Sequence, residues 1–435
     1  MKVGTFCSNR QTILFDKSEN FQVGVPTEDF LGVALPPKLA PIADPDVYTQ
    51  AIRTPCCGES IATLVARRRA KSASILVSDA TRAVPTSLVA ASLVQALLDA
   101  GIALENILFV VALGVHRDAT QQEMRSFLGA ELFGRVRIEN HTPYCADQLV
   151  FLGTTPQGTP VEVYRRAYEC DLHISIGKVE PHCFAGFSGG RKSVLPGISS
   201  ARAIAANHTA ANISHPRAVP GILEGNPVHE DMLAAAALYR LDFTVQFVVN
   251  DQLEPAVIFA GDPITCHQKA VSFLRKALVL PIPRIPDILV ATTGQPKNID
   301  FYQAVNSLAA LDPILTEQTI LVLACECPEG FNSPDMLRPF EQTDSLAGLE
   351  RYMLSHYQIQ MDCTLMILRL LKRKVKIIVC SPNLDERTLR NMYLIPCRDQ
   401  KELMPLAYKL CGKPHPKVFF CPHPQKGLPV LSTEQ

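Results

Sequence analysis

Short apolar runs that alternate with longer amphipathic segments restrict the fold of this 435-residue chain more than any other feature. The runs are rich in Val, Ile and Leu without clean alternation, which is typical of strands buried on both faces of a parallel sheet. This order predicts an α/β protein with mostly parallel sheets. The predicted strands are 73–78, 107–112, 172–176, 244–249, 288–292, 320–324 and 375–380, and the predicted helices are 87–100, 119–128, 200–211, 227–239, 266–277, 302–311 and 360–374.

A proline-rich segment, Pro281-Ile-Pro-Arg-Ile-Pro286, interrupts this pattern. Closely spaced prolines continue neither a helix nor a central strand, so we interpret the segment as an interdomain linker. We predict an N-terminal α/β domain at 1–278 and a C-terminal α/β domain at 287–395, with the active site in the cleft between them. The remaining segment, 396–435, contains a predicted helix at 400–411 and a strand at 418–421, and it can pack back on either domain.

The composition argues against two classes of partner. Lys and Arg number 42 and so do Asp and Glu, whereas nucleic acids and anionic membranes both favour an excess of basic residues. The longest apolar stretch, 107–115, is far shorter than the roughly 20 residues that a membrane-spanning helix needs, and no secretory signal is visible. The 14 cysteines include the adjacent Cys56 and Cys57. We therefore expect a cytoplasmic protein whose cysteines are mostly small core residues.

The densest motif follows the predicted strand at 172–176 and reads Gly177-Lys-Val-Glu-Pro-His182-Cys-Phe-Ala-Gly186-Phe-Ser-Gly189-Gly190-Arg191-Lys192-Ser193. Its glycines allow backbone N–H groups to approach an anion closely. Compared with the phosphate loop G-x-x-x-x-G-K-[ST], however, Arg191 stands where the second glycine belongs. One interpretation is therefore a nucleotide-binding phosphotransferase with a degenerate P-loop at Gly186–Ser193. Another is a tight glycine turn with solvated Arg191 and Lys192.

Two shorter motifs follow other predicted strands, at the sheet edge where α/β proteins bind ligands. In Asp79-Ala80-Thr81-Arg82, the aspartate can accept hydrogen bonds from sugar hydroxyls and the arginine can hold a phosphate or carboxylate. The alternative is that Asp79 or Thr81 only caps the next helix. His116, in Gly114-Val-His116-Arg117, can serve as a general acid or base, or be an ordinary hydrogen-bonded loop residue.

His208 lies within the predicted helix 200–211, where it can ligate a metal or simply be a surface histidine. The other histidines show no metal-ligand spacing, and Cys325-x-Cys327 is too short for a zinc knuckle.

The combination of these motifs resembles the lactate racemase family, the nickel-pincer-nucleotide enzymes. Their order matches, and so do the gaps from His182 to Lys192 and from Lys192 to His208. In the second predicted domain, Gly294-Gln-Pro-Lys-Asn-Ile-Asp300-Phe-Tyr302-Gln303 resembles the substrate-contacting turn of that family. The resemblance extends over roughly residues 20–410.

The resemblance implies an isomerase, a racemase or epimerase of 2-hydroxy acids that works by hydride removal and return. Its cofactor would be nickel pyridinium-3,5-bisthiocarboxylic acid mononucleotide, the nickel-pincer nucleotide, supplied by cofactor maturation enzymes. Lys192 would hold this cofactor covalently through a thioamide, and His208 would be the protein ligand of the nickel. The other implied roles are cofactor binding by Asp79, Ala80, Thr81 and Arg82, acid–base catalysis by His116 and His182, and substrate binding by Arg82 and Gln303.

The chemistry agrees with two acid–base residues. Removing the Cα proton of a 2-hydroxy acid is difficult because the neighbouring carboxylate already carries negative charge. Hydride removal avoids this charge and requires a redox-active cofactor. Inversion then requires an acid–base group for each enantiomer. A noncatalytic paralogue that only binds a nucleotide would need neither histidine.

Two departures from the family affect the predicted substrate. Asn306 stands where lactate racemases carry a lysine three residues after the Tyr-Gln pair, so carboxylate recognition there is altered. The chain has no Trp, although those enzymes place one near the substrate, and the corresponding region, 357–363, is polar and sulfur-rich. A sugar acid or a dicarboxylate is therefore as good a candidate as lactate.

Overall fold

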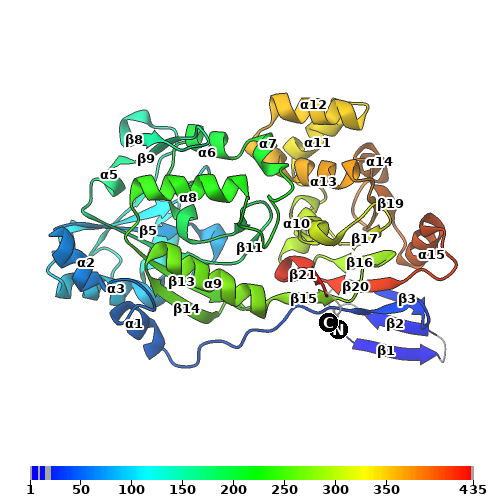
Figure 1. Cartoon of the computed structure of the whole chain (residues 1–435), viewed down its shortest axis with the longest axis horizontal. Coiled ribbons are helices and arrows are strands. Elements are labelled where there is room, and N and C mark those ends of the chain that lie inside the picture. Colours follow the sequence, from blue (N-terminus) through cyan, green and yellow to red (C-terminus); the bar gives the residue numbers. More distant parts are fainter. Residues whose placement is uncertain (1, 8–9, 15–20, 433–435) are drawn as a thin grey trace. The chain divides into compact units, whose positions relative to one another are not determined.

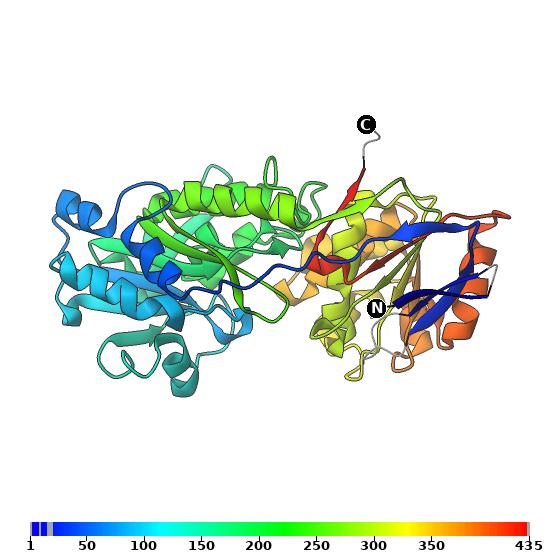
Figure 2. The same ribbon diagram turned by 90° about the horizontal axis from the view of Figure 1, so that it is seen from below.

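The computed structural model describes residues 2–7, 10–14 and 21–432 and contains two compact units (Figures 1 and 2). The middle unit comprises Lys38–Thr209 and Ile222–Ala277, and the terminal unit comprises Met1–Pro37, Ala210–Gly221 and Leu278–Gln435. Each unit contains a six-stranded, mostly parallel sheet, which confirms the predicted α/β class. In the described part of the chain, no helix has both the length and the apolar character needed to cross a membrane.

The unit boundaries differ from the predicted domains 1–278 and 287–395. The start of the chain belongs to the terminal unit because β4 (Phe30–Val33) pairs with β20 (Val418–Pro422). The described part of the last segment, 396–432, belongs to this unit as well, and not to the other one. The proposed linker also differs, since Pro281 lies in β15 (Val279–Ile282), which pairs with β21 (Leu428–Leu431) in a two-stranded sheet that tolerates proline.

The sheet of the middle unit has the order β14-β13-β10-β5-β6-β7 and is parallel except at β14. In chain order the strands run outward from β5 to β7 on one side and from β10 to β14 on the other. The topological switch point therefore lies between β5 and β10, where open α/β sheets bind ligands at the carboxyl ends of their strands. The strands are β5 (Ala73–Ser78), β6 (Ile107–Ala112), β7 (Arg137–Asn140), β10 (Leu172–Lys178), β13 (Phe243–Val249) and β14 (Pro255–Gly261).

Helices cover both faces of this sheet (Figures 1 and 2). Ile75, Ile174 and Val245 share one core with α1 (Asp46–Arg53), α2 (Ile61–Arg68), α3 (Ser87–Asp99) and α4 (Gln121–Leu128). On the other face Ser74 contacts the Tyr239 hydroxyl of α8 (Pro227–Tyr239), and α9 (Pro263–Ala277) packs against β13 and β14. Burial on both faces explains why these strands lack polar alternation. Smaller elements of the unit are β8 (Leu149–Thr154), β9 (Pro160–Tyr164), α5 (Arg165–Tyr168), β11 (Pro181–His182), β12 (Gly186–Phe187) and α6 (Ala201–Asn207).

The main sheet of the terminal unit, β19-β18-β17-β16-β20-β4, is parallel throughout. Val290 and Val322 on one face pack in a core with β3 (Gln22–Pro26) and α15 (Gln400–Cys411). β3 also pairs with β2 (Arg10–Leu14), and β2 with β1 (Lys2–Cys7). The remaining elements are α7 (Ala210–Ile213), β16 (Ile288–Thr292), α10 (Phe301–Leu311), β17 (Ile320–Ala324), α11 (Pro334–Glu341), α12 (Leu346–His356), α13 (Asp362–Lys372), β18 (Lys376–Cys380), α14 (Glu386–Asn391) and β19 (Ile395–Cys397).

One predicted helix is wrong. The segment 200–211 is not continuous, because α6 ends at Asn207 and α7 begins at Ala210 in the other unit. His208 occupies the C-cap position of α6 with a non-helical backbone (φ −90°, ψ 51°).

Candidate active site

Three of the sequence motifs follow neighbouring strands of the middle unit. Asp79 comes directly after β5, His116 follows β6, and the glycine-rich segment follows β10. β5 lies between β6 and β10 in a parallel ladder, so the carboxyl ends of all three strands lie at one edge of the sheet. The fold therefore brings together at the switch point residues that are far apart in the sequence.

Asp79 and His116 form a hydrogen-bonded pair. One carboxylate oxygen of Asp79 lies 2.9 Å from Nδ1 of His116, and the other accepts the backbone N–H of Thr81 at 2.7 Å. Asp79 thus both caps the short helix at Ala80–Arg82 and orients the imidazole. Burial favours a higher pKa for Asp79, but hydrogen bonds from His116 and Thr81 outweigh it and lower the pKa. Because Nδ1 of His116 donates a hydrogen bond to the Asp79 carboxylate, Nε2 of His116 is the nitrogen that can accept a proton.

Several backbone N–H groups of the glycine-rich segment are already hydrogen-bonded within the protein. The N–H groups of Ser188, Gly190 and Lys192 donate to the Glu180 carbonyl, the Gln246 side chain and the Gly189 carbonyl, at 2.9–3.1 Å. Gly189 has φ +80°, and a Cβ there would lie 2.5 Å from Oε1 of Gln246. These N–H groups are therefore not free to bind a phosphate, which argues against a cradle of the P-loop kind.

Arg191 is buried, so the interpretation of a solvated arginine is wrong. Its guanidinium donates to the carbonyl oxygens of Ala185 and Phe187 at 3.0 and 2.8 Å and lies 2.8 Å from Nε2 of His267. Burial lowers the pKa of Arg191 to about 9. Arg191 therefore stabilises the turn from inside, next to Lys192.

Lys192 and His182 are direct neighbours. Nζ of Lys192 lies 3.1 Å from Nε2 of His182, whose Nδ1 accepts the backbone N–H of Ala185 at 3.3 Å. Burial, followed by the charges of Arg82 and Arg191, lowers the pKa of Lys192 well below its ordinary value. Burial, followed by the charge of Lys192, likewise lowers the pKa of His182. This environment favours the uncharged lysine amine, which is the nucleophilic form.

His208 is buried beside this pair. Its Nδ1 has no hydrogen-bond partner among the residues that the structure describes. Burial, followed by the charge of Lys192, lowers the pKa of His208 to about 3, so the neutral imidazole is favoured. The preceding residue, Asn207, is anchored by Asp231 at 2.8 Å, which fixes the end of α6. A buried neutral imidazole with an unpaired nitrogen is the form of histidine that ligates metals.

Phe184 is a site residue that the sequence interpretation missed. The centre of its ring lies 4.7 Å from that of His182, 5.2 Å from that of His208 and 5.8 Å from Nζ of Lys192. All three proposed functional side chains therefore contact one buried ring. The available signal was its position two residues after His182 within the motif.

The other predicted substrate residues lie on α10 of the terminal unit. The N–H of Gln303 is capped by Asp300 at 2.7 Å, and the Asn306 side chain donates to the Gln303 carbonyl at 2.9 Å. The Tyr302 hydroxyl donates to Asp362 at 3.0 Å. Burial raises the pKa of Asp362 to about 6, although the hydrogen bond from Tyr302 lowers it. The polar segment at 357–363 thus contributes a carboxylate next to α10, which the sequence interpretation did not single out.

The middle unit thus carries an aspartate–histidine pair, a buried lysine and a buried unpaired histidine near the switch point of its mostly parallel sheet, a set of groups typical of an α/β enzyme. Comparisons with known proteins identify the family. Residues 16–221 match the lactate racemase N-terminal domain and residues 283–428 match the lactate racemase C-terminal domain. The chain therefore belongs to the lactate racemase family of isomerases, which uses a nickel cofactor.

Individual lactate racemases are similar to this chain in sequence along most of their length. The chain is 28% identical to the lactate racemase of Thermoanaerobacterium thermosaccharolyticum, over 84% of this chain and 86% of that protein. It is 30% identical to the lactate racemase of Lactiplantibacillus plantarum, over 78% and 80%. The lactate racemase apoprotein structure from T. thermosaccharolyticum matches with a TM-score of 0.84 at 26% identity, covering 95% of this chain and 98% of that one. A Thermotoga maritima crystal structure, at 20% identity and a TM-score of 0.64, covers 91% and 100% and supports the fold alone.

Proposed function

We propose that this protein racemises or epimerises a 2-hydroxy acid and carries the nickel-pincer nucleotide on Lys192. The observation that carries the proposal is the arrangement around Phe184, where an amine with a depressed pKa, a histidine with an unpaired buried nitrogen and a second histidine surround one ring. A phosphotransferase would need neither of these histidines, and the hydrogen bonds already made by several N–H groups of the glycine-rich segment argue against a P-loop.

The donor groups fit this cofactor. Lys192 would hold it as a thioamide, since an uncharged amine is the reactive form, and His208 would ligate the nickel. Arg82 is exposed, and its charge reaches both Lys192 and His182, so it can neutralise a phosphate or a substrate carboxylate. Since the Asp79 carboxylate is occupied by His116 and Thr81, contacts of Asp79–Arg82 with the nucleotide fall mainly to Arg82 and the backbone. When bound, the cofactor supplies the acceptor and donor of the substrate hydride.

The two histidines move the hydroxyl proton. Loss of hydride from C2 and of the hydroxyl proton converts the 2-hydroxy acid into a 2-oxo acid, and reversal on the opposite face inverts the centre. His116, oriented by Asp79, would take or return the proton for one enantiomer and His182 for the other. Gln303 and Arg82 would hold the carboxylate or hydroxyl. Asn306 provides an amide in place of the family lysine, so it would assist only by hydrogen bonding.

The first test is an intact-mass spectrum of protein produced together with the cofactor maturation enzymes, with nickel counted in the same sample. The wild-type chain should carry an adduct of nucleotide mass and about one nickel, and Lys192→Ala should carry no covalent adduct. Lys178→Ala is the matched control, because that lysine pairs with Glu180 at 2.9 Å and should leave the adduct intact. An adduct that survives in Lys192→Ala would refute the anchor, and unmodified wild-type protein under conditions that load a known lactate racemase would refute the proposed function.

A further inference from the structure

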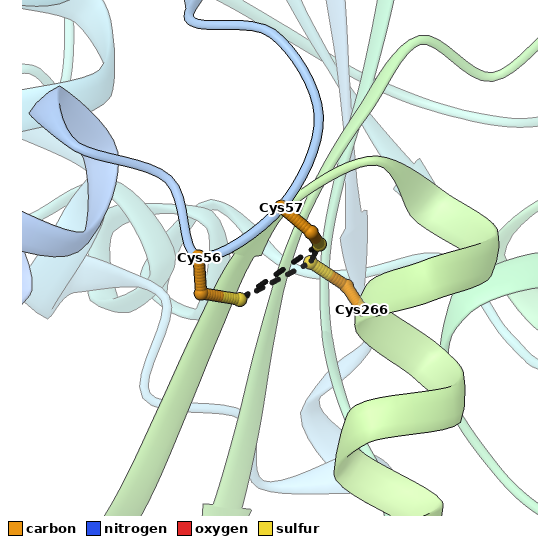
Figure 3. A group of neighbouring side chains, drawn as sticks. All are labelled: Cys56, Cys57 and Cys266. Atoms are coloured by element: carbon orange, nitrogen blue, oxygen red, sulfur yellow. Dashed lines mark hydrogen bonds between the residues drawn. The ribbon is translucent and has the colours of Figure 1, made fainter.

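Three cysteine sulfurs converge in the middle unit, among residues that the proposed reaction does not use. Cys56 and Cys57 lie between α1 and α2, and Cys266 lies in the first turn of α9 (Figure 3). The sulfur of Cys57 is 3.1 Å from that of Cys266, and the sulfur of Cys56 is 3.8 and 3.9 Å from those of Cys57 and Cys266. The sequence interpretation took the cysteines mostly as isolated core residues, because more than 200 positions separate Cys57 from Cys266.

The backbone holds these sulfurs in place. The N–H of Cys56 donates to the Ala260 carbonyl at 2.9 Å, and the N–H of Asp262 donates to the Cys57 carbonyl at 3.1 Å. Gly261 makes this approach possible, since a Cβ there would lie 1.9 Å from the Cys57 carbonyl oxygen. The segment carrying two of the thiols is therefore fixed to the end of β14, just before the helix that carries the third.

The spacing of the sulfurs agrees with ligation of one metal ion. Tetrahedral zinc with Zn–S bonds of about 2.3 Å separates its sulfurs by about 3.8 Å, close to two of the three observed distances. For the observed triangle, a point about 0.9 Å out of its plane is about 2.3 Å from all three sulfurs. Among the described residues, no other histidine, cysteine or carboxylate ligand atom joins this group.

We propose that Cys56, Cys57 and Cys266 bind one zinc ion as thiolates, with a water molecule as the fourth ligand. The side chain of Cys56 is exposed, so the fourth position can face solvent. Binding releases the three thiol protons to solvent and leaves a net charge of −1 on the zinc and sulfurs. Lys269, whose ammonium donates to the Cys56 carbonyl at 2.6 Å, and the N-terminus of α9 both favour this charge.

The chemistry of the group favours zinc over other ions. Thiolates select soft metals. An ion that lies out of the plane of its three sulfurs cannot have the square-planar geometry typical of Ni²⁺. Cu⁺ would leave a charge of −2, with only Lys269 and the helix N-terminus to offset it. Zinc would also fix the start of α9, where His267 lies 2.8 Å from Arg191 and 3.0 Å from the Ser188 carbonyl. The ion would thus stabilise the helix that supports the glycine-rich segment.

The test titrates Zn²⁺ into the reduced, chelator-treated full chain against a chromophoric competitor, and records the visible spectrum with Co²⁺. We expect one zinc per chain and the absorption of tetrahedral Co²⁺–thiolate ligation. Cys57→Ser should weaken zinc binding more than about 100-fold, since loss of even an outer-shell partner of a metal ligand costs 10–100-fold. Cys56→Ser provides the same comparison at an exposed position, where a substitution disturbs packing less.

Cys145→Ser is the matched control, because this thiol belongs to the same unit and lies outside the cluster. It should bind zinc as the wild type does. Equal affinity in the wild type and both cluster variants, or no binding by the wild type, would overturn the site. So would a Cys57–Cys266 disulfide that resists the reductant, as shown by thiol counting and mass.

Discussion

At the scale of single residues, each proposed functional group is held by a neighbour that the chemistry does not consume. Asp79 orients His116, Phe184 separates and positions His182 and His208, and Arg191 braces the turn that presents Lys192. Because these partners fix side-chain geometry before substrate binds, they reduce the entropy lost on reaching the reactive arrangement.

Replacing His182 by Ala should remove isomerisation and leave cofactor loading near normal. A general base typically contributes about 10²–10⁴-fold, or about 3–5 kcal/mol of barrier, so the rate should fall by that factor. The measurement is racemisation followed by chiral chromatography, with nickel content and adduct mass determined on the same preparation. Full activity in the loaded variant would exclude His182 as an acid–base group.

Replacing Asn306 by Lys should shift preference toward lactate. The variant regains the cation of the family motif and loses only the hydrogen bond from the Asn306 amide to the Gln303 carbonyl. We expect kcat/KM for lactate to rise relative to larger 2-hydroxy acids in a substrate panel. Asn306→Gln, which keeps an amide and adds no charge, is the control and should leave the ranking unchanged. An unchanged ranking in Asn306→Lys would place carboxylate recognition elsewhere.

At the scale of elements, the carboxylate that begins α13 should make stability depend on pH. Burial raises the pKa of Asp362 to about 6, whereas an unfolded Asp titrates near 3.9. Between these values the folded chain binds more protons than the unfolded chain, so the free energy of unfolding should fall as the pH rises from about 4 to 6 and then level off. We expect a loss of about 1–2 kcal/mol, less than the roughly 3 kcal/mol that the full difference in pKa would give, because the Asp362 side chain is half-buried.

Asp362→Asn is the matched variant, since an amide oxygen still accepts the Tyr302 hydroxyl and cannot titrate. Urea unfolding at several pH values should show the wild-type decline and a flatter profile in Asp362→Asn. Identical profiles for the two proteins would contradict the raised pKa.

Elements with strong local signals were predictable from the sequence. The strands 73–78, 107–112, 288–292 and 320–324 and the helices 227–239 and 400–411 are found with the predicted bounds, because apolar runs and capping residues define both ends. The break at His208 was not predictable, since Ala-rich sequence continues on both sides and the backbone leaves the helix only where the chain passes to the other unit. β14 was missed because it is an antiparallel edge strand that begins at a proline.

The sequence predicted which residues form the candidate site better than it predicted the contacts between their side chains. The sequence placed Asp79 and His116 in separate loops, and only the strand order β10-β5-β6 brings them to hydrogen-bonding distance. The same applies to Cys266, which is separated from Cys57 in the sequence by helices α2 to α8 and by all six strands of the main sheet of the middle unit.

At the scale of the whole molecule, the two units share a mostly parallel six-stranded sheet but differ in strand order. In the middle unit strands run outward in chain order on both sides of the switch point between β5 and β10, whereas in the terminal unit they do so only from β16 to β19, and β20 and the early strand β4 lie on the other side of β16. The Gly294–Gln303 segment follows β16, and the N–H of His423, just after β20, donates to the Thr292 carbonyl at 3.0 Å. Polar residues thus follow the carboxyl ends of strands in both sheets, as expected for α/β enzymes.

The pairing of β4 with β20 has a consequence for synthesis of the chain. Phe30 lies opposite Val418, which leaves the ribosome 388 residues later, or roughly 20–80 seconds later at ordinary elongation rates. All six strands of the main sheet of the middle unit lie between those two positions and can pair in the meantime. The nascent chain therefore carries β4 without its partner strand for most of translation, and an unpaired strand of this kind is prone to aggregate until β20 has been made.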